Sequence, residues 1–182
     1  MSSENNREWL LNLLSTYTLI WPDERANALL TTFIRRQPDC FERTCFDDGH
    51  VTGSAWVVCP QRRRVLLTHH RKLQKWLQLG GHSDGDANTL RVAQREAEEE
   101  SGLRVKPIND AVFDIDIHTI PARGEDPKHK HYDVRFLFEA DDHAPLTISS
   151  ESNDLRWIAI EDLPNLTAEE SVLRMARKSA DL

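Results

Sequence analysis

Cysteine is scarce in this chain of 182 residues, which has only Cys40, Cys45 and Cys59. Three scattered thiols are too few for a disulfide framework, so we expect reduced cysteines and a cytoplasmic location. The sequence also has no apolar run of membrane-spanning length and no secretory leader pattern. We therefore expect neither export nor a membrane partner.

Basic residues are fewer than acidic ones. Lysine and arginine number 23 against 30 aspartates and glutamates, which leaves a net charge of -7. A negative field repels nucleic-acid backbones and anionic lipid surfaces, so we expect no nucleic-acid partner. A small polyanionic substrate would need a local countercharge, and a divalent cation held by carboxylates would supply it.

Residues 1–182 are expected to form a single domain, in which an N-terminal helical extension (1–48) precedes a core (49–182). Apolar residues recur at helical spacing over 9–14 and 24–34, and Trp21-Pro22-Asp23 separates them with Asp23 as the expected cap. This pattern predicts a helical hairpin.

The remaining segments alternate between strand and helix patterns. We expect a helix that is capped by Asn88 or Thr89 and stops at Gly102, and a tail helix over 167–178 with a capping box at Thr167 and Glu170. The expected strands are 51–59, 64–69, 111–120, 131–139 and 155–160, with a glycine loop at 79–81 before the first of these helices. The fold class is therefore α/β, an α/β/α sandwich with a mixed sheet.

The most informative segment is the acidic helix over 95–103. On a helix, Glu96, Glu99 and Glu100 share one stripe beside the apolar stripe, whereas Glu98 points to the far side. Three carboxylates at this spacing can converge on one hard cation, and oxygen ligands favour Mg²⁺ or Mn²⁺ over zinc. The alternative is an ordinary solvated helix face.

These residues resemble the signature of the Nudix hydrolases. Gly81 is followed by Arg95-Glu96-Ala97-x-Glu99-Glu100-x-Gly102-Leu103, so the motif spans 81–103, and a softer similarity covers about 51–164. The first fifty residues are not explained by it. Ala87 stands where the family usually has its first glutamate, and Asp86, one residue earlier, could reach Arg95 instead.

The resemblance implies a pyrophosphohydrolase that uses Mg²⁺ or Mn²⁺ and cleaves a small nucleoside diphosphate linked to another moiety. It implies catalytic roles for Arg95, Glu96 and Glu99, with Arg95 holding the carboxylates in place. The metal ligands would be Glu96, Glu99 and Glu100, and the substrate would be bound at Gly80, Gly81 and His82.

A general base is harder to assign, and Glu151 is our candidate. It lies in a polar loop, 149–153, just before the last expected strand, where a mobile carboxylate could swing over the site. The alternative is a loop glutamate without a catalytic role.

Other polar and aromatic residues leave alternatives open. His118, His129 and His131 could contact phosphates together with the neighbouring lysines, or they could be solvated at a strand entrance. Trp76 is a candidate to stack on a base, although tryptophans at strand spacing usually belong to the core. Cys40, Cys45 and His50 fit no standard zinc spacing, so structural cysteines are the preferred interpretation.

Two further functions compete with hydrolysis. A binding or regulatory module that keeps the fold without efficient catalysis is suggested by Ala87 and by the unexplained first fifty residues. Isopentenyl diphosphate isomerase has a related fold but needs a catalytic cysteine in a context that is missing around Cys59. The helical hairpin could cover a sheet edge, shape the substrate pocket or form a homodimer contact.

Overall fold

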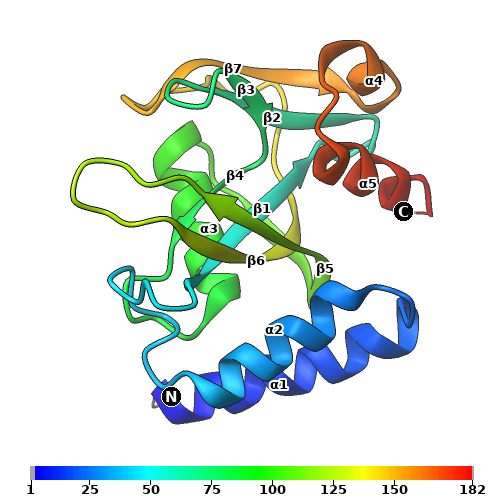
Figure 1. The fold of residues 1–182 in the computed structure, drawn as a ribbon. Coiled ribbons are helices and arrows are strands. Elements are labelled where there is room, and N and C mark those ends of the chain that lie inside the picture. Colours follow the sequence, from blue (N-terminus) through cyan, green and yellow to red (C-terminus); the bar gives the residue numbers. More distant parts are fainter. Residues whose placement is uncertain (1–2, 182) are drawn as a thin grey trace.

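The computed structural model describes residues 3–181, which begin with an antiparallel helical hairpin formed by α1 (Ser3–Ile20) and α2 (Arg25–Arg36) (Figure 1). The hairpin predicted from the apolar spacing is therefore confirmed. Its expected cap was wrong, because the N-cap residue of α2 is Glu24, whose carboxylate accepts from the Tyr17 hydroxyl rather than capping the helix. Within 3–181, no helix combines the length and apolarity needed to cross a bilayer.

The strands of residues 3–181 form one mixed sheet of seven strands. They are β1 (His50–Val58), β2 (Arg64–His70), β3 (Lys75–Leu77), β4 (Leu79–His82), β5 (Lys106–Ile120), β6 (His129–Glu139) and β7 (Ser152–Ala159). The order is β3-β2-β1-β6-β5, β4 pairs with β1, and β7 pairs with β2. Only β1 and β6 pair in parallel, so the predicted mixed sheet is confirmed.

Two strands were missed by the sequence prediction. β4 lies where a glycine loop was expected and β3 lies just before it, and Gly80 and Gly81 are paired in β4 with Ser54 and Gly53 of β1. The prediction failed because glycine disfavours strands locally, whereas here the lack of a side chain lets another element approach the strand closely.

The helix that follows, α3 (Thr89–Ser101), has the predicted ends. The Asn88 side chain accepts from the backbone N–H of Arg91, and Gly102 closes the helix in the left-handed region with φ of 71°. The chain ends with α4 (Leu163–Leu166) and α5 (Glu170–Lys178), flanked by short 3₁₀ turns at Ile160–Asp162 and Ser179–Asp181. The predicted capping box was wrong, because α5 begins at Glu170 and Thr167 instead accepts from the backbone of Glu169 at 3.1 Å.

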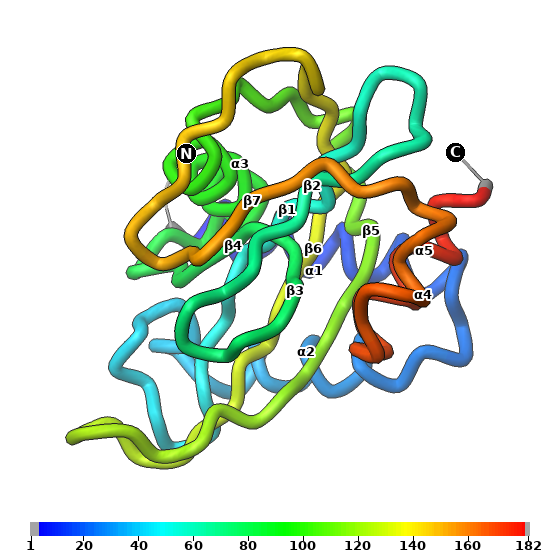
Figure 2. Tube along the Cα trace, turned by 90° about the horizontal axis from the view of Figure 1, so that it is seen from above, coloured from blue at the N-terminus to red at the C-terminus, as the bar shows by residue number. Residues whose placement is uncertain are grey.

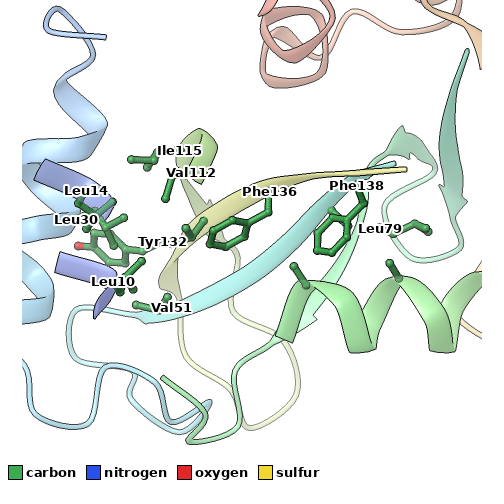
Figure 3. Packing of buried hydrophobic residues seen from close by; sticks show 14 of the residues in the cluster. Leu10, Leu14, Leu30, Val51, Leu79, Val112, Ile115, Tyr132, Phe136 and Phe138 are labelled. Carbon is green, nitrogen blue, oxygen red and sulfur yellow. The ribbon is translucent and has the colours of Figure 1, made fainter. Parts of the chain in front are cut away.

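One face of the sheet is covered by the hairpin and α3. Leu10, Leu14 and Leu30 pack toward β5 and β6, and Phe136 and Phe138 continue the same core toward α3 (Figure 3). The hairpin therefore covers the sheet beside the edge strand β5. Apolar side chains remain exposed on its outer side, so the homodimer contact stays a prediction; they are Leu19, Ile20 and Leu29.

The other face carries a second apolar cluster near α4 and α5 and a buried ionic network around Asp114 of β5. The Asp114 carboxylate accepts from Arg135, Arg174 and Lys178. Burial alone would raise the pKa of Asp114, but the hydrogen bond from Arg174 and the surrounding positive charges bring it below its ordinary value. Lys178 also contacts Glu24, so the network joins the C-terminal helix to the N-terminal hairpin.

Figure 2 shows the loop that joins β5 to β6 extending away from the rest of the chain, at the end remote from α4 and α5. Its tip, residues 121–128, is exposed and contains an isolated bridge between Arg123 and Asp126. The strands predicted on either side of it, over 111–120 and 131–139, are therefore present. His129, where this loop enters β6, is buried by contrast. Several histidines lie close together at this end of the sheet.

Candidate functional site

The site is built where β4 lies against α3. A Cβ atom on Gly81 would lie 2.3 Å from Glu96 Oε2, so a side chain at this position would displace the Glu96 carboxylate. Gly80 has φ of +153°, and a Cβ there would lie 2.7 Å from Ser54 Cα. The two glycines therefore let a helix carrying carboxylates approach a strand closely.

Glu100 is the most perturbed acid of this site. Burial first, and then the negative charge of Glu96, raise the pKa of Glu100 to about 8, although the backbone N–H of Gly80 donates to it and opposes the rise. Among the described residues, Glu100 Oε2 is buried and has no hydrogen-bond partner. Because buried polar atoms are nearly always paired in native proteins, this oxygen is suited to an external ligand.

Arg95 connects β4 to the carboxylates. Its Nη2 donates to the His82 carbonyl oxygen at 3.0 Å and to Glu96 Oε1 at 2.6 Å. Glu99 is exposed, and its charge acts on Arg95 and on Glu100. The structure therefore brings Glu96, Glu99 and Glu100 to the same side of α3.

Glu98 faces elsewhere, as the helical spacing predicts. Its Oε1 accepts from the backbone N–H of Val105 at 3.3 Å, in the segment that follows the helix. Glu98 therefore offers a matched control for substitutions of its acidic neighbours.

The departure from the family signature at Ala87 has a structural reason. Ala87 is only 1% exposed and belongs to the main apolar core, where a carboxylate would be costly. Asp86 does not replace the missing glutamate as a hydrogen-bond partner of Arg95. It binds the Arg91 guanidinium through two contacts of 2.7 Å and accepts from the backbone N–H of Asn88 at 2.9 Å.

Glu151 lies in a turn near these groups, although its sequence position is about fifty residues away. It is exposed, and its negative charge raises the pKa of Glu100 and opposes the lowering of the pKa of His82. The backbone of the turn is fixed by a bond of 2.9 Å from the Arg71 N–H to the Glu151 carbonyl oxygen. A side chain on this turn can therefore act electrostatically on the glutamates of α3.

Two interpretations of His118, His129 and His131 were left open, contact with phosphates or a solvated strand entrance, and the structure bears on the second. His129 is buried in β6, and burial, then the charges of His50 and His82, lower the pKa of His131 to about 2. Neither His129 nor His131 is therefore a solvated side chain at a strand entrance. His118 is more exposed and pairs with Asp116 at 3.1 Å.

The remaining candidates have ordinary surroundings. Cys40, Cys45 and Cys59 are buried free thiols, and burial raises the pKa of Cys40 to about 12, which agrees with the structural interpretation. Trp76 is partly buried, and the Arg156 guanidinium lies 5.5 Å from its ring centroid. Base stacking at Trp76 stays a prediction.

Sequence reasoning missed a buried acceptor, Asp133, on the same sheet face as the histidines. Its carboxylate accepts from Thr52 at 2.9 Å, Ser54 at 2.7 Å and Gln78 at 3.1 Å. The available signal was the polar residue at every second position of β6, because such alternation places those side chains on one face. The arrangement as a whole places a buried, unpartnered carboxylate oxygen of α3 beside the glycines of β4.

The sequence matches the family model described as NUDIX domain over residues 49–178. Among curated proteins, none matches this sequence significantly.

Several solved structures share the fold. A hydrolase of the NUDIX family from Clostridium perfringens is 28% identical, with a TM-score of 0.55 over 72% of this chain and 96% of that one. An Ap4A hydrolase from C. elegans, solved as a binary complex, is 17% identical, with a TM-score of 0.56 over 72% and 95%. The E. coli dihydroneopterin triphosphate pyrophosphohydrolase is 12% identical, with a TM-score of 0.52 over 72% and 96%.

Proposed function

This chain belongs to the NUDIX domain family and is a Nudix-type pyrophosphohydrolase, and from that premise we propose that it depends on a divalent metal. We propose as its substrate a small nucleoside diphosphate linked to another moiety, cleaved within the diphosphate. The observation that carries the metal proposal is the buried, unpartnered oxygen of Glu100 beside Glu96.

The donor set fits Mg²⁺ or Mn²⁺. Glu96, Glu99 and Glu100 offer only carboxylate oxygens, which hard cations prefer, and their mutual repulsion is relieved when a cation is shared. We assign these three residues as the ligands. When bound, such a cation neutralises diphosphate charge and lowers the pKa of an attacking water.

The chain itself supplies positioning and proton transfer. Arg95 holds the Glu96 carboxylate and the His82 carbonyl, so it fixes α3 relative to the end of β4. Gly80, Gly81 and the backbone of His82 are proposed to contact the substrate, because Gly81 faces Glu96 and the His82 carbonyl oxygen reaches Arg95. The close approach permitted by the glycines would place a diphosphate beside the carboxylates.

Glu151 is proposed as the general base. Its exposure leaves its carboxylate free to accept a proton, and its charge already acts on Glu100 from the facing turn. A base on a turn can adjust its distance to the substrate more easily than one on α3.

The family and the net charge support the proposed substrate class. Structural neighbours are named for Ap4A and for dihydroneopterin triphosphate, so the fold accommodates different groups attached to a polyphosphate. The net charge of -7 disfavours nucleic acids, whereas a small diphosphate is compensated locally by the cation.

The experiment offers ADP-ribose, nucleotide sugars, dinucleoside polyphosphates and nucleoside triphosphates to the purified protein, with Mg²⁺, with Mn²⁺ or with EDTA. Products are separated by ion-exchange chromatography and identified by mass spectrometry. We expect metal-dependent cleavage of a diphosphate-linked compound, and we expect E99Q to reduce turnover by ~100-fold or more, since it removes a proposed metal ligand.

The matched control is E98Q, which makes the same substitution one residue earlier on the same helix. It should retain wild-type turnover, because the Glu98 carboxylate accepts from the Val105 backbone N–H and glutamine can still accept that bond. If E98Q and E99Q were equally impaired, the assigned helix face would be wrong. Ligand binding without cleavage of any compound would favour the alternative, a nucleotide-binding or regulatory module.

A further inference from the structure

Three histidine side chains meet at one end of the sheet, on the face opposite the glutamates of α3. The histidine cluster consists of His50 of β1, His82 of β4 and His131 of β6. The strand register brings them together, because β1 pairs His50 with His131 on one side and Thr52 with His82 on the other. The pairing thus aligns three imidazoles that are far apart in the sequence.

The geometry of the cluster is close to that of a metal site. One ring nitrogen from each histidine lies within 4.8 Å of the others. A tetrahedral zinc with Zn–N bonds of about 2.0–2.1 Å needs nitrogens separated by roughly 3.4 Å, so small ring rotations suffice. The ring centroids of His50 and His131 are already only 4.6 Å apart.

His50 has the hydrogen bonding of a metal ligand. It is 1% exposed, and its Nδ1–H donates to the Cys45 carbonyl oxygen at 3.4 Å. Among residues 3–181, its Nε2 is buried and has no hydrogen-bond partner. A histidine that donates one nitrogen to a backbone carbonyl presents the lone pair of the other, which is the arrangement that orients metal-binding histidines.

The cluster lies on a different face from the carboxylates. Successive side chains of a strand point to opposite faces, and a side chain at Gly81 would point at Glu96 of α3. His82, the next residue, therefore points to the other face, where His50 and His131 also lie. The donor class differs as well, since imidazole nitrogens suit borderline metals and carboxylates suit hard ones.

We propose that His50, His82 and His131 form a second metal site that binds one Zn²⁺, or a divalent metal of the same class, and joins β4 to β1 and β6. Burial, and then the other histidines of this region, hold the pKa of His50 at about 4 and that of His131 at about 2, so both rings are neutral ligands at physiological pH. Three protein ligands leave a fourth position for water.

Arg43 competes with the metal in the unliganded protein. Its guanidinium donates to His82 Nδ1 at 2.6 Å and also pairs with Asp84 at 2.9 Å. A guanidinium beside a ligand nitrogen both occupies the lone pair and repels a cation. Because more than half of the Arg43 side chain is exposed, it can turn away toward solvent when a metal arrives.

The test titrates untagged, EDTA-treated protein with Zn²⁺ in a calorimeter, in the presence of excess Mg²⁺ that occupies the carboxylates. We expect one zinc per chain. H131Q should weaken binding by more than the ~10- to 100-fold that is typical of losing an outer partner of a ligand. R43Q should tighten binding, because it removes the guanidinium that competes for His82 Nδ1 and repels a cation. Co²⁺ in place of Zn²⁺ should give the intense visible absorption of a four-coordinate site.

The controls separate this site from the hydrolytic one. H143Q changes an exposed histidine outside the cluster and should bind zinc as the wild type does, and so should E100Q. Circular dichroism and thermal unfolding check whether H131Q is folded, while R43Q, at an exposed position, tests the site without changing a buried residue. Zinc binding that is unchanged in both H131Q and R43Q, or lost in E100Q and kept in H131Q, would overturn the proposal, whatever the hydrolytic activity is.

Discussion

Replacing Glu100 by glutamine should change how the stability of the metal-free protein depends on pH. The pKa of Glu100 is raised from 4.5 to about 8, chiefly by burial and by Glu96. Below about pH 4.5 both states are protonated and the folded protein keeps its full stability. As the pH rises toward 8, the unfolded chain ionises while the folded one holds its proton, so stability is lost.

The size of the effect follows from the two pKa values. The interval between 4.5 and about 8, at ~1.36 kcal/mol per pH unit, corresponds to roughly 4–5 kcal/mol of lost unfolding free energy. At pH 5 the loss is under ~1 kcal/mol, because ionisation of the unfolded chain has only begun. Glutamine is neutral throughout, so the stability of E100Q relative to wild type should increase by roughly 3 kcal/mol between pH 5 and pH 8.

The measurement is urea unfolding in EDTA at both pH values, followed by tryptophan fluorescence, for wild type, E100Q and E98Q. Comparing the pH difference cancels the constant cost of burying an amide. E98Q should show no such change, and adding Mg²⁺ at pH 8 should stabilise wild type far more than E100Q. If the wild type and E100Q had parallel pH profiles, Glu100 would not be a buried, repelled carboxyl, and the proposed site would lose its main support.

Two further substitutions test the structure around the site. K178M removes the buried ammonium that contacts Asp114, Glu24 and Tyr17. It should therefore lower the free energy of unfolding, measured by urea titration, by roughly 3–5 kcal/mol. A loss below ~1 kcal/mol would mean that the ionic network is solvated. A87E restores the glutamate of the family signature. Because Ala87 is a core residue, this change should destabilise the protein by at least about 2 kcal/mol and should not raise turnover. A variant with faster turnover and an undiminished Tm would contradict this expectation.

The sequence predicted most where local chemistry and apolar spacing agreed. The helix α3 has the expected ends because Asn88 and Gly102 satisfy its terminal backbone groups in the way their residue types favour. The helical hairpin followed from apolar periodicity, and the acidic stripe followed from 100° steps along α3. The predicted capping residues of α2 and α5 were wrong, because neither helix begins with a side-chain cap.

Tertiary packing decided what the spacing could not show. Gly80 and Gly81 were predicted to form a loop because glycine is a poor strand former. They lie in β4, where the absence of side chains allows α3 to pack closely against the strand. Ala87 departs from the family signature in the sequence, and the structure places it in the apolar core, where a carboxylate would be unfavourable. His50 was compared with the neighbouring cysteines, although its partners come from β4 and β6.

The amino-acid sequence by itself determined the longer helices and strands, the acidic face of α3 and the resemblance that led to the family, because these depend on residues close together along the chain. Only the tertiary structure decided which carboxylate is buried without a partner and which histidines share a face. Burial and long-range proximity depend on strand register and helix packing, and these are set by the chain as a whole.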